Sequence, residues 1–271
     1  MNANSPIGVF DSGVGGLTVV SEITKQLPSE SIIYFGDTAR VPYGNKSAET
    51  VTNYSRQIVH FLLKNNVKAI VIACNTASAF ALETLKLELD IPIIGVVKPG
   101  AKAAYETTKN KRIGVIGTLG TTSSKIYNQY ISTYDNTIFV DNEACPLFVP
   151  LVEEGMINDS VTHEMIKRYT KRLINENIDT LVLGCTHYPL LKEEINKVLG
   201  GKINLVNPAY ETALALKDIL TKNNLLNTSN AEPKHRFYVS DGATQFKSFA
   251  GKILTCHVEE IKDINNIETY I

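Results

Sequence analysis

Ala69-Ile70-Val71-Ile72-Ala73-Cys74-Asn75-Thr76 is an apolar run that changes to polar residues at a single point. An uninterrupted apolar run of this length is typical of a strand buried on both faces, as in a parallel sheet covered by helices. Val182-Leu183-Gly184-Cys185-Thr186-His187 resembles positions 71–76 at an offset of 111 residues (185 − 74). The sequence therefore predicts two related α/β units, each with a cysteine at the end of a buried strand.

Similar apolar runs recur along the chain and alternate with longer amphipathic segments, which is typical of βα units. A second internal match, between Ile7–Phe10 and Ile113–Ile116, has an offset of 106 residues (113 − 7). Strands are expected at Ile7–Phe10, Ile32–Phe35, Ala69–Ala73, Ile91–Val96, Arg112–Ile116, Thr137–Val140, Thr180–Gly184, Ile203–Val206 and Arg236–Val239. Helices are expected from an N-cap at Ser47 to about Asn65, from Ser160 or Thr162 to about Asn177, and over Tyr210–Asn223.

The length of 271 residues is sufficient for two domains, each with its own core. We expect a discontinuous first α/β domain, made of residues 1–97 plus 208–271, and a second α/β domain at 98–207. In this division the C-terminal segment packs back onto the first part of the chain. The best linker candidate is Thr221–Lys234, which is rich in Asn, Ser and Thr.

Composition excludes several classes of function. A hydrophobic fraction of 44% and a charged fraction of 20% describe an ordinary globular protein. The net charge is −1 and neither sign forms a long run, so the sequence has no basic segment of the kind that binds nucleic acid or an anionic membrane. A small-molecule substrate is therefore expected. There is neither a recognisable signal peptide nor an apolar run long enough to span a membrane, which predicts a cytoplasmic protein whose four cysteines are thiols.

Ligands of open α/β sheets bind beyond the carboxyl ends of the strands. Polar clusters follow five of the expected strands, at Asp11–Gly16, Gly36–Thr38, Cys74–Thr76, Gly117–Thr122 and Cys185–His187. These clusters are the candidates for a functional site.

Cys74 and Cys185 are the strongest candidates for chemistry. A free thiol with a pKa near 8.5 is only roughly 3% thiolate at pH 7, but a helix N-terminus favours the anion. The alternative is that each cysteine is a small buried hydrophobe, which is the interpretation we adopt for Cys145 and Cys256 because no polar cluster follows them.

His187 lies two residues after Cys185 and could contact its thiol, although a solvated helix-capping histidine is the simpler alternative. Cys74, Cys185, His187 and Asp11 could in principle converge on zinc, but the spacing of zinc ligands is missing and no metal is expected.

Two further clusters suggest groups that bind substrate. The glycine-rich loop after Phe10 is not a dinucleotide fingerprint, and Asp11 would repel a phosphate but could bind an ammonium group; its alternative role is an N-cap in a tight turn. Thr118 and Thr121, at an expected helix start, could bind a carboxylate together with free backbone N–H groups, or simply cap the helix.

Taken together, these clusters resemble the signatures of the glutamate racemases, a cofactor-independent family. The motifs are Phe10-Asp11-Ser12-Gly13-Val14-Gly15-Gly16-Leu17-Thr18, Gly36-Asp37-Thr38-Ala39-Arg40-Val41-Pro42-Tyr43-Gly44, Ala73-Cys74-Asn75-Thr76-Ala77-Ser78, Cys145-Pro146-Leu147-Phe148-Val149-Pro150-Leu151-Val152-Glu153 and Gly184-Cys185-Thr186-His187-Tyr188-Pro189-Leu190. They span nearly the whole chain.

The resemblance implies an active site between two α/β domains, with Cys74 and Cys185 as catalytic thiols assisted by Asp11, Glu153 and His187. It also implies that substrate is bound or oriented by Asp11, Ser12, Tyr43, Gly44, Asn75, Thr76, Thr186 and His187, to which we add Thr118 and Thr121. No pyridoxal or other cofactor is implied, and whether the chain forms a homodimer stays open. One departure is Asn207, where many relatives are expected to carry Asp, so a charge is missing there.

The implied reaction explains why two thiols are needed. Inverting a stereocentre through a planar carbanion requires a base on one face and an acid on the other, and the two roles exchange with direction. The product would be D-glutamate for bacterial peptidoglycan, the cell-wall polymer that maintains cell shape. The alternatives are an aspartate or broader amino-acid racemase of the same family, and a non-catalytic module that binds an amino acid.

Overall fold

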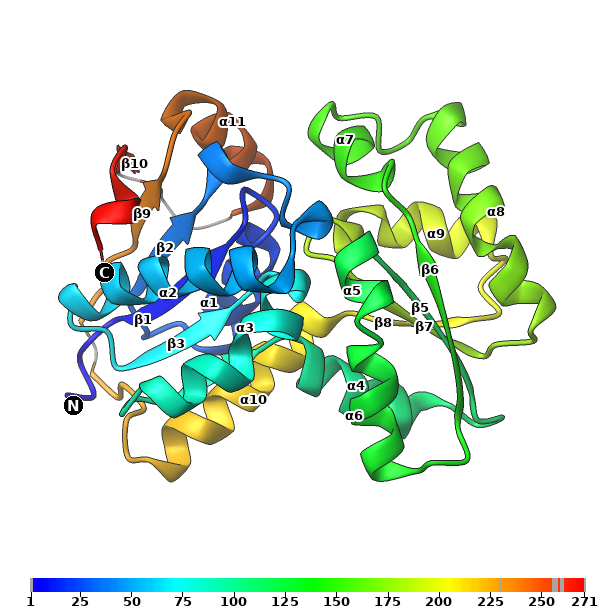
Figure 1. Ribbon diagram of the computed structural model, residues 1–271, viewed down its shortest axis with the longest axis horizontal. Coiled ribbons are helices and arrows are strands. Elements are labelled where there is room, and N and C mark those ends of the chain that lie inside the picture. Colours follow the sequence, from blue (N-terminus) through cyan, green and yellow to red (C-terminus); the bar gives the residue numbers. More distant parts are fainter. Residues whose placement is uncertain (1, 230, 255–257, 259–260, 271) are drawn as a thin grey trace.

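The computed structural model describes residues 2–229, 231–254, 258 and 261–270, arranged as two α/β units side by side (Figure 1). Among these residues the larger unit has a sheet in the order β10 (Ile261–Asp263), β9 (Arg236–Val239), β2 (Ile32–Gly36), β1 (Ile7–Asp11), β3 (Ala69–Ile72) and β4 (Ile93–Gly95). The smaller unit has the order β6 (Phe139–Ala144), β5 (Arg112–Gly117), β7 (Thr180–Gly184) and β8 (Asn204–Val206). Every recorded strand pair is parallel, which confirms the predicted fold class.

The predicted internal repeat is confirmed by the sheet topology. The order β2-β1-β3-β4 in the larger unit matches β6-β5-β7-β8 in the smaller one, so β1 corresponds to β5 and β3 to β7. Cys74 follows β3 after one intervening residue, and Cys185 follows β7 directly. Each cysteine therefore occupies the same topological position in its own unit.

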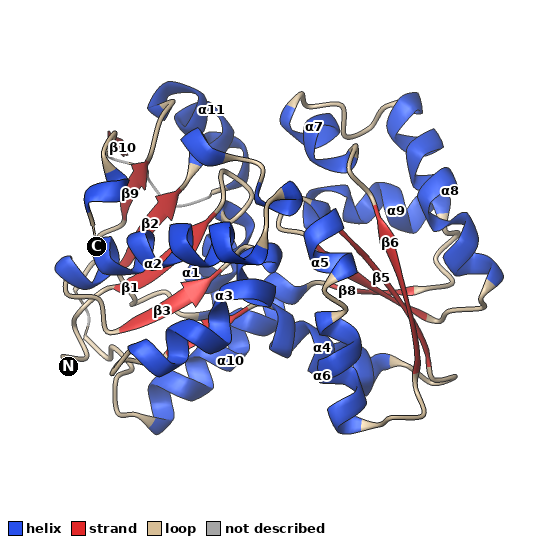
Figure 2. Ribbon diagram, in the orientation of Figure 1, coloured by secondary structure: helices blue, strands red, loops and turns tan. Residues whose placement is uncertain are grey.

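Helices connect the strands and cover both sides of each sheet (Figure 2). They are α1 (Leu17–Gln26), α2 (Ala48–Lys64), α3 (Asn75–Glu88), α4 (Val97–Thr107), α5 (Leu119–Ser123), α6 (Ile126–Tyr134), α7 (Phe148–Glu153), α8 (Ser160–Asn175), α9 (Lys192–Val198), α10 (Pro208–Lys222) and α11 (Ala243–Ile253). Short 3-10 turns form η1 (Thr38–Arg40), η2 (Tyr43–Asn45), η3 (Tyr188–Leu191) and η4 (Ile267–Thr269). No helix in the described ranges is long and apolar enough to cross a membrane.

Both faces of the larger sheet are buried. On β1, Ile7 and Val9 belong to one apolar cluster and Phe10 to another, and on β3 Val71 and Ile72 divide in the same way. Successive side chains of a strand point to opposite faces, so each face has its own core. This arrangement explains why these strands are uninterrupted apolar runs.

One of these cores continues from the larger unit into the smaller one. The cluster that contains Ile7 also contains Val115 of β5 and Val182 of β7. It passes between α4 and α10, which are in contact and contribute the buried Ala101 and Ala213. The two cysteine-bearing strands are thus joined through packed side chains as well as through the chain.

Several predicted boundaries were wrong for identifiable reasons. Asp159, rather than Ser160 or Thr162, caps α8 by accepting a hydrogen bond from the N–H of Val161. The strand predicted at residues 137–140 is β6, which runs to Ala144. As an edge strand with a single partner, β6 carries polar side chains, so hydrophobicity underestimates its length.

The ends of α10 also differ from expectation. The helix begins at Pro208, and the Oδ1 atom of Asn207 caps it by accepting a hydrogen bond from the N–H of Ala209 at 3.1 Å. An uncharged amide performs this capping well, which gives Asn207 a structural role. The expected linker beyond α10 packs back onto the larger unit, where Asn227 donates to Glu30.

Candidate active site

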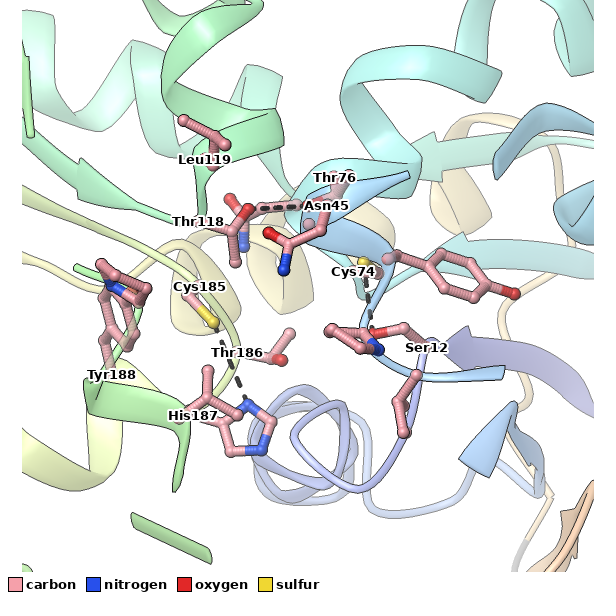
Figure 3. Close-up of a pocket in the computed structure, with 18 of the residues that line it drawn as sticks. Ser12, Asn45, Cys74, Thr76, Thr118, Leu119, Cys185, Thr186, His187 and Tyr188 are labelled. Carbon is pink, nitrogen blue, oxygen red and sulfur yellow. Dashed lines mark hydrogen bonds between the residues drawn. The ribbon is translucent and has the colours of Figure 1, made fainter. Parts of the chain in front are cut away.

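A cavity of about 300 Å³ lies between the two units, at the carboxyl ends of their central strands. Ser12, Cys74, Thr118 and Cys185 line it, each within two residues of the end of β1, β3, β5 or β7. This is the position at which open parallel sheets bind their ligands. In Figure 3, Cys74 and Ser12 lie on one side of the cavity, and Cys185 and His187 lie on the other.

Cys74 lies at the N-terminus of α3. Its Sγ atom accepts a hydrogen bond from the N–H of Ala77 at 3.4 Å, and its thiol contacts Oγ of Ser12 at 3.7 Å. Burial raises the pKa of the Cys74 thiol to about 12, and the nearby Asp11 carboxylate adds to the rise. At neutral pH the Cys74 thiol is therefore protonated.

Cys185 has a different environment. Its Sγ atom lies 3.9 Å from Nδ1 of His187, whose Nε2 atom lies 2.8 Å from Oε1 of Glu153. Burial alone would lower the pKa of His187, but the contacts with Cys185 and Glu153 and the charge of Asp11 outweigh it and raise this pKa to about 10. His187 is thus an imidazolium at neutral pH and places a positive charge beside Cys185.

The two thiols are therefore unequal although both are 6% exposed. Cys74 lies near the Asp11 carboxylate and stays protonated, whereas Cys185 lies beside the cation of His187. The cavity thus has a protonated thiol on one side and a cysteine beside a cation on the other. Inversion of a stereocentre needs an acid on one face of the carbon atom and a base on the other.

Asp11 is fully buried and lies behind the cavity wall, not on its surface. Its Oδ2 atom accepts a hydrogen bond from the N–H of Gly13 at 3.0 Å, and Thr186 donates to Oδ1 at 3.4 Å. Burial raises the pKa of Asp11, and the charge of His187 opposes the rise. The hydrogen bond from Gly13 confirms the predicted tight turn, but Asp11 does not cap the helix, because α1 begins after Gly16 without a side-chain cap.

The hydroxyl groups predicted after β5 form a cluster across the two units. Thr118 caps α5 by accepting from the N–H of Thr121, so the predicted capping is confirmed. Its Oγ1 atom also lies 2.8 Å from Oγ1 of Thr76 in the larger unit. Thr118 and Thr76 line the cavity, whereas Thr121 is buried behind them.

Gly15 allows the units to approach closely beside Cys185. A Cβ atom at this position would lie 2.3 Å from Oγ1 of Thr186 and 2.4 Å from Nδ1 of His187. Either contact would displace a group of the site itself. A hydrogen bond of 2.9 Å from the Thr18 hydroxyl to the carbonyl of Thr186 holds the same loop in place.

The other predicted site residues lie around the cavity. Tyr43, Gly44, Asn75, Thr186 and Glu153 all line it. Cys145 is fully buried in the core of the smaller unit, as expected of a small hydrophobe, and Cys256 lies outside the described residues. Within the described residues no group of three or more His, Cys, Asp or Glu side chains could hold a metal ion, so the zinc alternative has no geometric support.

The family model for Asp/Glu/Hydantoin racemase matches residues 7–215. A glutamate racemase of Geobacter metallireducens is 50% identical over 248 residues, or 92% of each chain. The crystal structure of a Bacillus anthracis glutamate racemase matches with a TM-score of 0.94 at 42% identity, covering 98% of this chain and 99% of that one. A Francisella tularensis glutamate racemase, solved with D-glutamate, gives 0.92 at 39% identity, covering 99% and 100%.

The chain belongs to the Asp/Glu/Hydantoin racemase family. Members of a racemase family are isomerases, so the resemblance seen in the sequence motifs is confirmed at the level of family and enzyme class. A racemase must remove a proton from one face of a carbon atom and add one to the other, which is a reaction that needs two acid/base groups. Family membership therefore directs attention to the two unequal thiols.

Sequence reasoning missed part of the cavity of this racemase. The missed lining residues come mainly from two proline-containing segments, and they are Gly13, Val41, Pro42, Asn45, Leu119, Pro146, Val149, Pro150 and Tyr188. Most of them are apolar and carry no chemical signature. The segment 145–153 was noticed only as a motif ending in Glu153, and its apolar members could have been included on the same signal.

The unequal thiols of this racemase can be tested by alkylation. With a pKa of about 12, Cys74 is a thiolate in only about one molecule in 10⁵ at pH 7, and the thiolate is the reacting form. Brief treatment of the ligand-free protein with iodoacetamide, followed by peptide mapping, is expected to label Cys185 at least about tenfold faster than Cys74. Asp11→Asn should accelerate labelling of Cys74, and Cys145 should stay unlabelled. Faster labelling of Cys74 in the unaltered protein would contradict this assignment.

Proposed function

We propose that this chain is a glutamate racemase that interconverts L- and D-glutamate with Cys74 and Cys185 as its two acid/base groups. The observation that carries the proposal is the placement of two unequal thiols at equivalent strand ends, lining one cavity from opposite sides. The choice of glutamate is supported by the relatives and solved structures named above, which are glutamate racemases covering nearly the whole chain.

In the L-to-D direction, the Cys185 thiolate removes the α-proton of L-glutamate. The carbon–hydrogen bond breaks, a sulfur–hydrogen bond forms at Cys185, and the electron pair is delocalised from the α-carbon into the carboxylate. The Cys74 thiol then donates its proton to the opposite face and becomes a thiolate. The D-to-L direction follows the same steps in reverse, with Cys74 as the base.

Hydrogen-bond donors stabilise the charge that develops on the substrate carboxylate. In this proposal Asn75, Thr76 and Thr186 supply donors close to the two thiols, because they follow the cysteines directly and line the cavity. Other parts of the wall, formed by Ser12, Tyr43, Gly44 and Thr118, orient the rest of glutamate. None of these steps needs a cofactor or a metal ion.

Three charged residues assist the thiols rather than carry the proton themselves. His187 places its positive charge beside Cys185, and the hydrogen bond to Glu153 helps to keep that charge in place. Asp11 and Thr121 act through their neighbours, because neither lines the cavity: Asp11 supports Thr186 and the loop at Gly13, and Thr121 supports Thr76.

The product, D-glutamate, fits a role in the synthesis of bacterial peptidoglycan in the cytoplasm. We also propose that the functional domains are residues 1–97 plus 208–271 and residues 98–207. The chain crosses from the larger sheet to the smaller one after β4 and returns to the larger sheet after β8, which supports this division. The cavity would then lie between domains that can move relative to one another.

The substrate is tested by assaying purified protein with L-glutamate, L-aspartate and L-alanine, without added cofactor and in the presence of a chelator. Loss of circular dichroism reports racemisation. Glutamate is expected to react at least about tenfold faster than aspartate, because a missing methylene costs about 10- to 200-fold in a fitted pocket. The variant with both Cys74→Ser and Cys185→Ser serves as the blank.

Two outcomes would replace the proposal with another function. Faster turnover of aspartate would identify an aspartate racemase of the same family. Binding of an amino acid without any turnover would indicate a non-catalytic module, and a requirement for zinc after chelation would contradict the two-thiol mechanism.

A further inference from the structure

A buried tyrosine links the smaller unit to the substrate cavity. Tyr127 lies on α6 and is 1% exposed, and its hydroxyl donates a hydrogen bond of 2.7 Å to Oδ1 of Asn75. Asn75 is the first residue of α3 in the larger unit, directly after Cys74, and it lines the cavity. The hydrogen bond therefore crosses between the units and ends beside a thiol.

This bond determines what Asn75 can offer to a ligand. A side-chain amide has one oxygen, which only accepts, and one nitrogen, which only donates. With Oδ1 directed to Tyr127, the N–H groups of Nδ2 remain for the cavity. The rotated amide would present its oxygen to an anionic carboxylate, which would be unfavourable.

The surroundings of Tyr127 keep its hydroxyl a donor. Burial raises the pKa of this phenol well above its ordinary value, and the charge of Cys185 raises it further, so the proton stays on the oxygen. The ring packs against two glycines: Cβ atoms at Gly184 and Gly100 would each lie 3.4 Å from a ring carbon. Tyr127 is thus packed beneath the residue that precedes Cys185.

We propose that Tyr127 is a positioning residue that fixes the Asn75 amide with its N–H groups toward the substrate carboxylate. The inference rests on the proposed function, since it assumes that an amino-acid carboxylate occupies the cavity. The hydrogen bond that orients Asn75 thus comes from a helix of the opposite unit. Approach of the two units then orients the amide at the same time as it brings the thiols together.

Tyr127→Phe removes only the hydroxyl and tests this role. Without its partner the amide samples both orientations, and its contact with the carboxylate weakens. Most of this loss is already felt in the bound substrate, because its carboxylate carries a full negative charge before the α-proton is removed. KM for glutamate is expected to rise about five- to tenfold, while kcat changes less than about threefold.

A matched control is available on the same helix. Tyr130 donates from α6 to Oε1 of Glu83 on α3 at 3.0 Å, which also links the units, but at the outer surface. Tyr130→Phe should leave both kinetic constants within about twofold of the unaltered protein. An equal rise of KM in both variants would mean that any loss of contact between α6 and α3 has this effect, and would overturn the proposal.

A double-mutant cycle separates positioning from general stability. Asn75→Ala should raise KM by itself, and adding Tyr127→Phe should then change KM less than about twofold, because the hydroxyl no longer has an amide to orient. Independent, multiplicative losses would show that Tyr127 does not act through Asn75. Melting temperatures of all variants report any structural cost separately.

A measurement without substrate keeps the inference distinct from the proposed function. The side-chain amide resonance of Asn75 in nitrogen-15 NMR spectra can be assigned as the signal lost in Asn75→Ala. It should shift or broaden in Tyr127→Phe and stay in place in Tyr130→Phe. An unchanged Asn75 signal in Tyr127→Phe would overturn the inference, whereas failure of the unaltered protein to racemise glutamate would overturn the proposed function alone.

Discussion

Replacing Cys74 or Cys185 by serine is expected to lower kcat/KM for glutamate by about 10³-fold or more in both directions. A serine hydroxyl is far too weakly acidic to provide a resting base, and acid/base groups of this kind contribute about 10²–10⁴-fold. Both substitutions act in both directions because each thiol is the acid in one direction and the base in the other. Circular dichroism with L- and D-glutamate as separate starting materials measures the two rates.

Cys145→Ser is the matched control, because this thiol is fully buried in the core of the smaller unit and does not line the cavity. It should keep the catalytic rate, with any change confined to the melting temperature. Cys256→Ser is expected to behave in the same way.

Combining the two active-site substitutions should reduce the rate little beyond either single change, since the thiols act as one unit. Similar activity in the four single serine variants would mean that Cys74 and Cys185, like the two control cysteines, are only small buried hydrophobes. Losses that multiply in the double variant would instead indicate two independent contributions.

His187→Asn is expected to have the second largest effect, a loss of kcat/KM of about 10²–10³-fold. It removes the imidazolium that faces Cys185 and leaves the Glu153 carboxylate without its partner. Alkylation of Cys185 by iodoacetamide should slow at the same time. Because L- and D-glutamate have equal free energies in water, kcat/KM must fall by the same factor in both directions.

The pH dependence gives a second readout of His187. Its pKa is raised to about 10, so the residue carries its charge below that pH and loses it above. The kcat/KM of the unaltered protein should therefore decline as pH rises through about 10, before the Cys74 thiol loses its proton near 12. His187→Asn should lack this decline.

His163→Asn is the control for a histidine–glutamate pair. His163 contacts Glu194 in the same unit, and neither residue lines the cavity. The rate of this variant and its pH profile should match those of the unaltered protein. If His187→Asn resembled His163→Asn in activity, the chain from Glu153 to Cys185 would have no part in catalysis.

The candidate catalytic residues could be predicted from the sequence because they lie at the carboxyl ends of the strands of a parallel sheet. Buried strands are apolar, so the polar residues that follow them stand out, and Cys74 and Cys185 do so at equivalent points of the internal repeat. The same reasoning failed for β6, whose polar residues belong to an edge strand. It also placed Asp11 and Thr121 in contact with substrate, although the structure buries both behind the cavity wall.

The sequence by itself determined the α/β fold class, the repeat and the two candidate thiols, because hydrophobic periodicity and strand-end polarity are local properties of the chain. Only the tertiary structure decided that the thiols are unequal. The cation beside Cys185 is His187, a neighbour in sequence, but the hydrogen-bond partner of His187 is Glu153 on α7. Asp11, at the end of another strand, raises the pKa of Cys74. The link from Tyr127 to Asn75 spans 52 residues and two units. Burial and charge depend on which segments meet in space, and no local pattern records that.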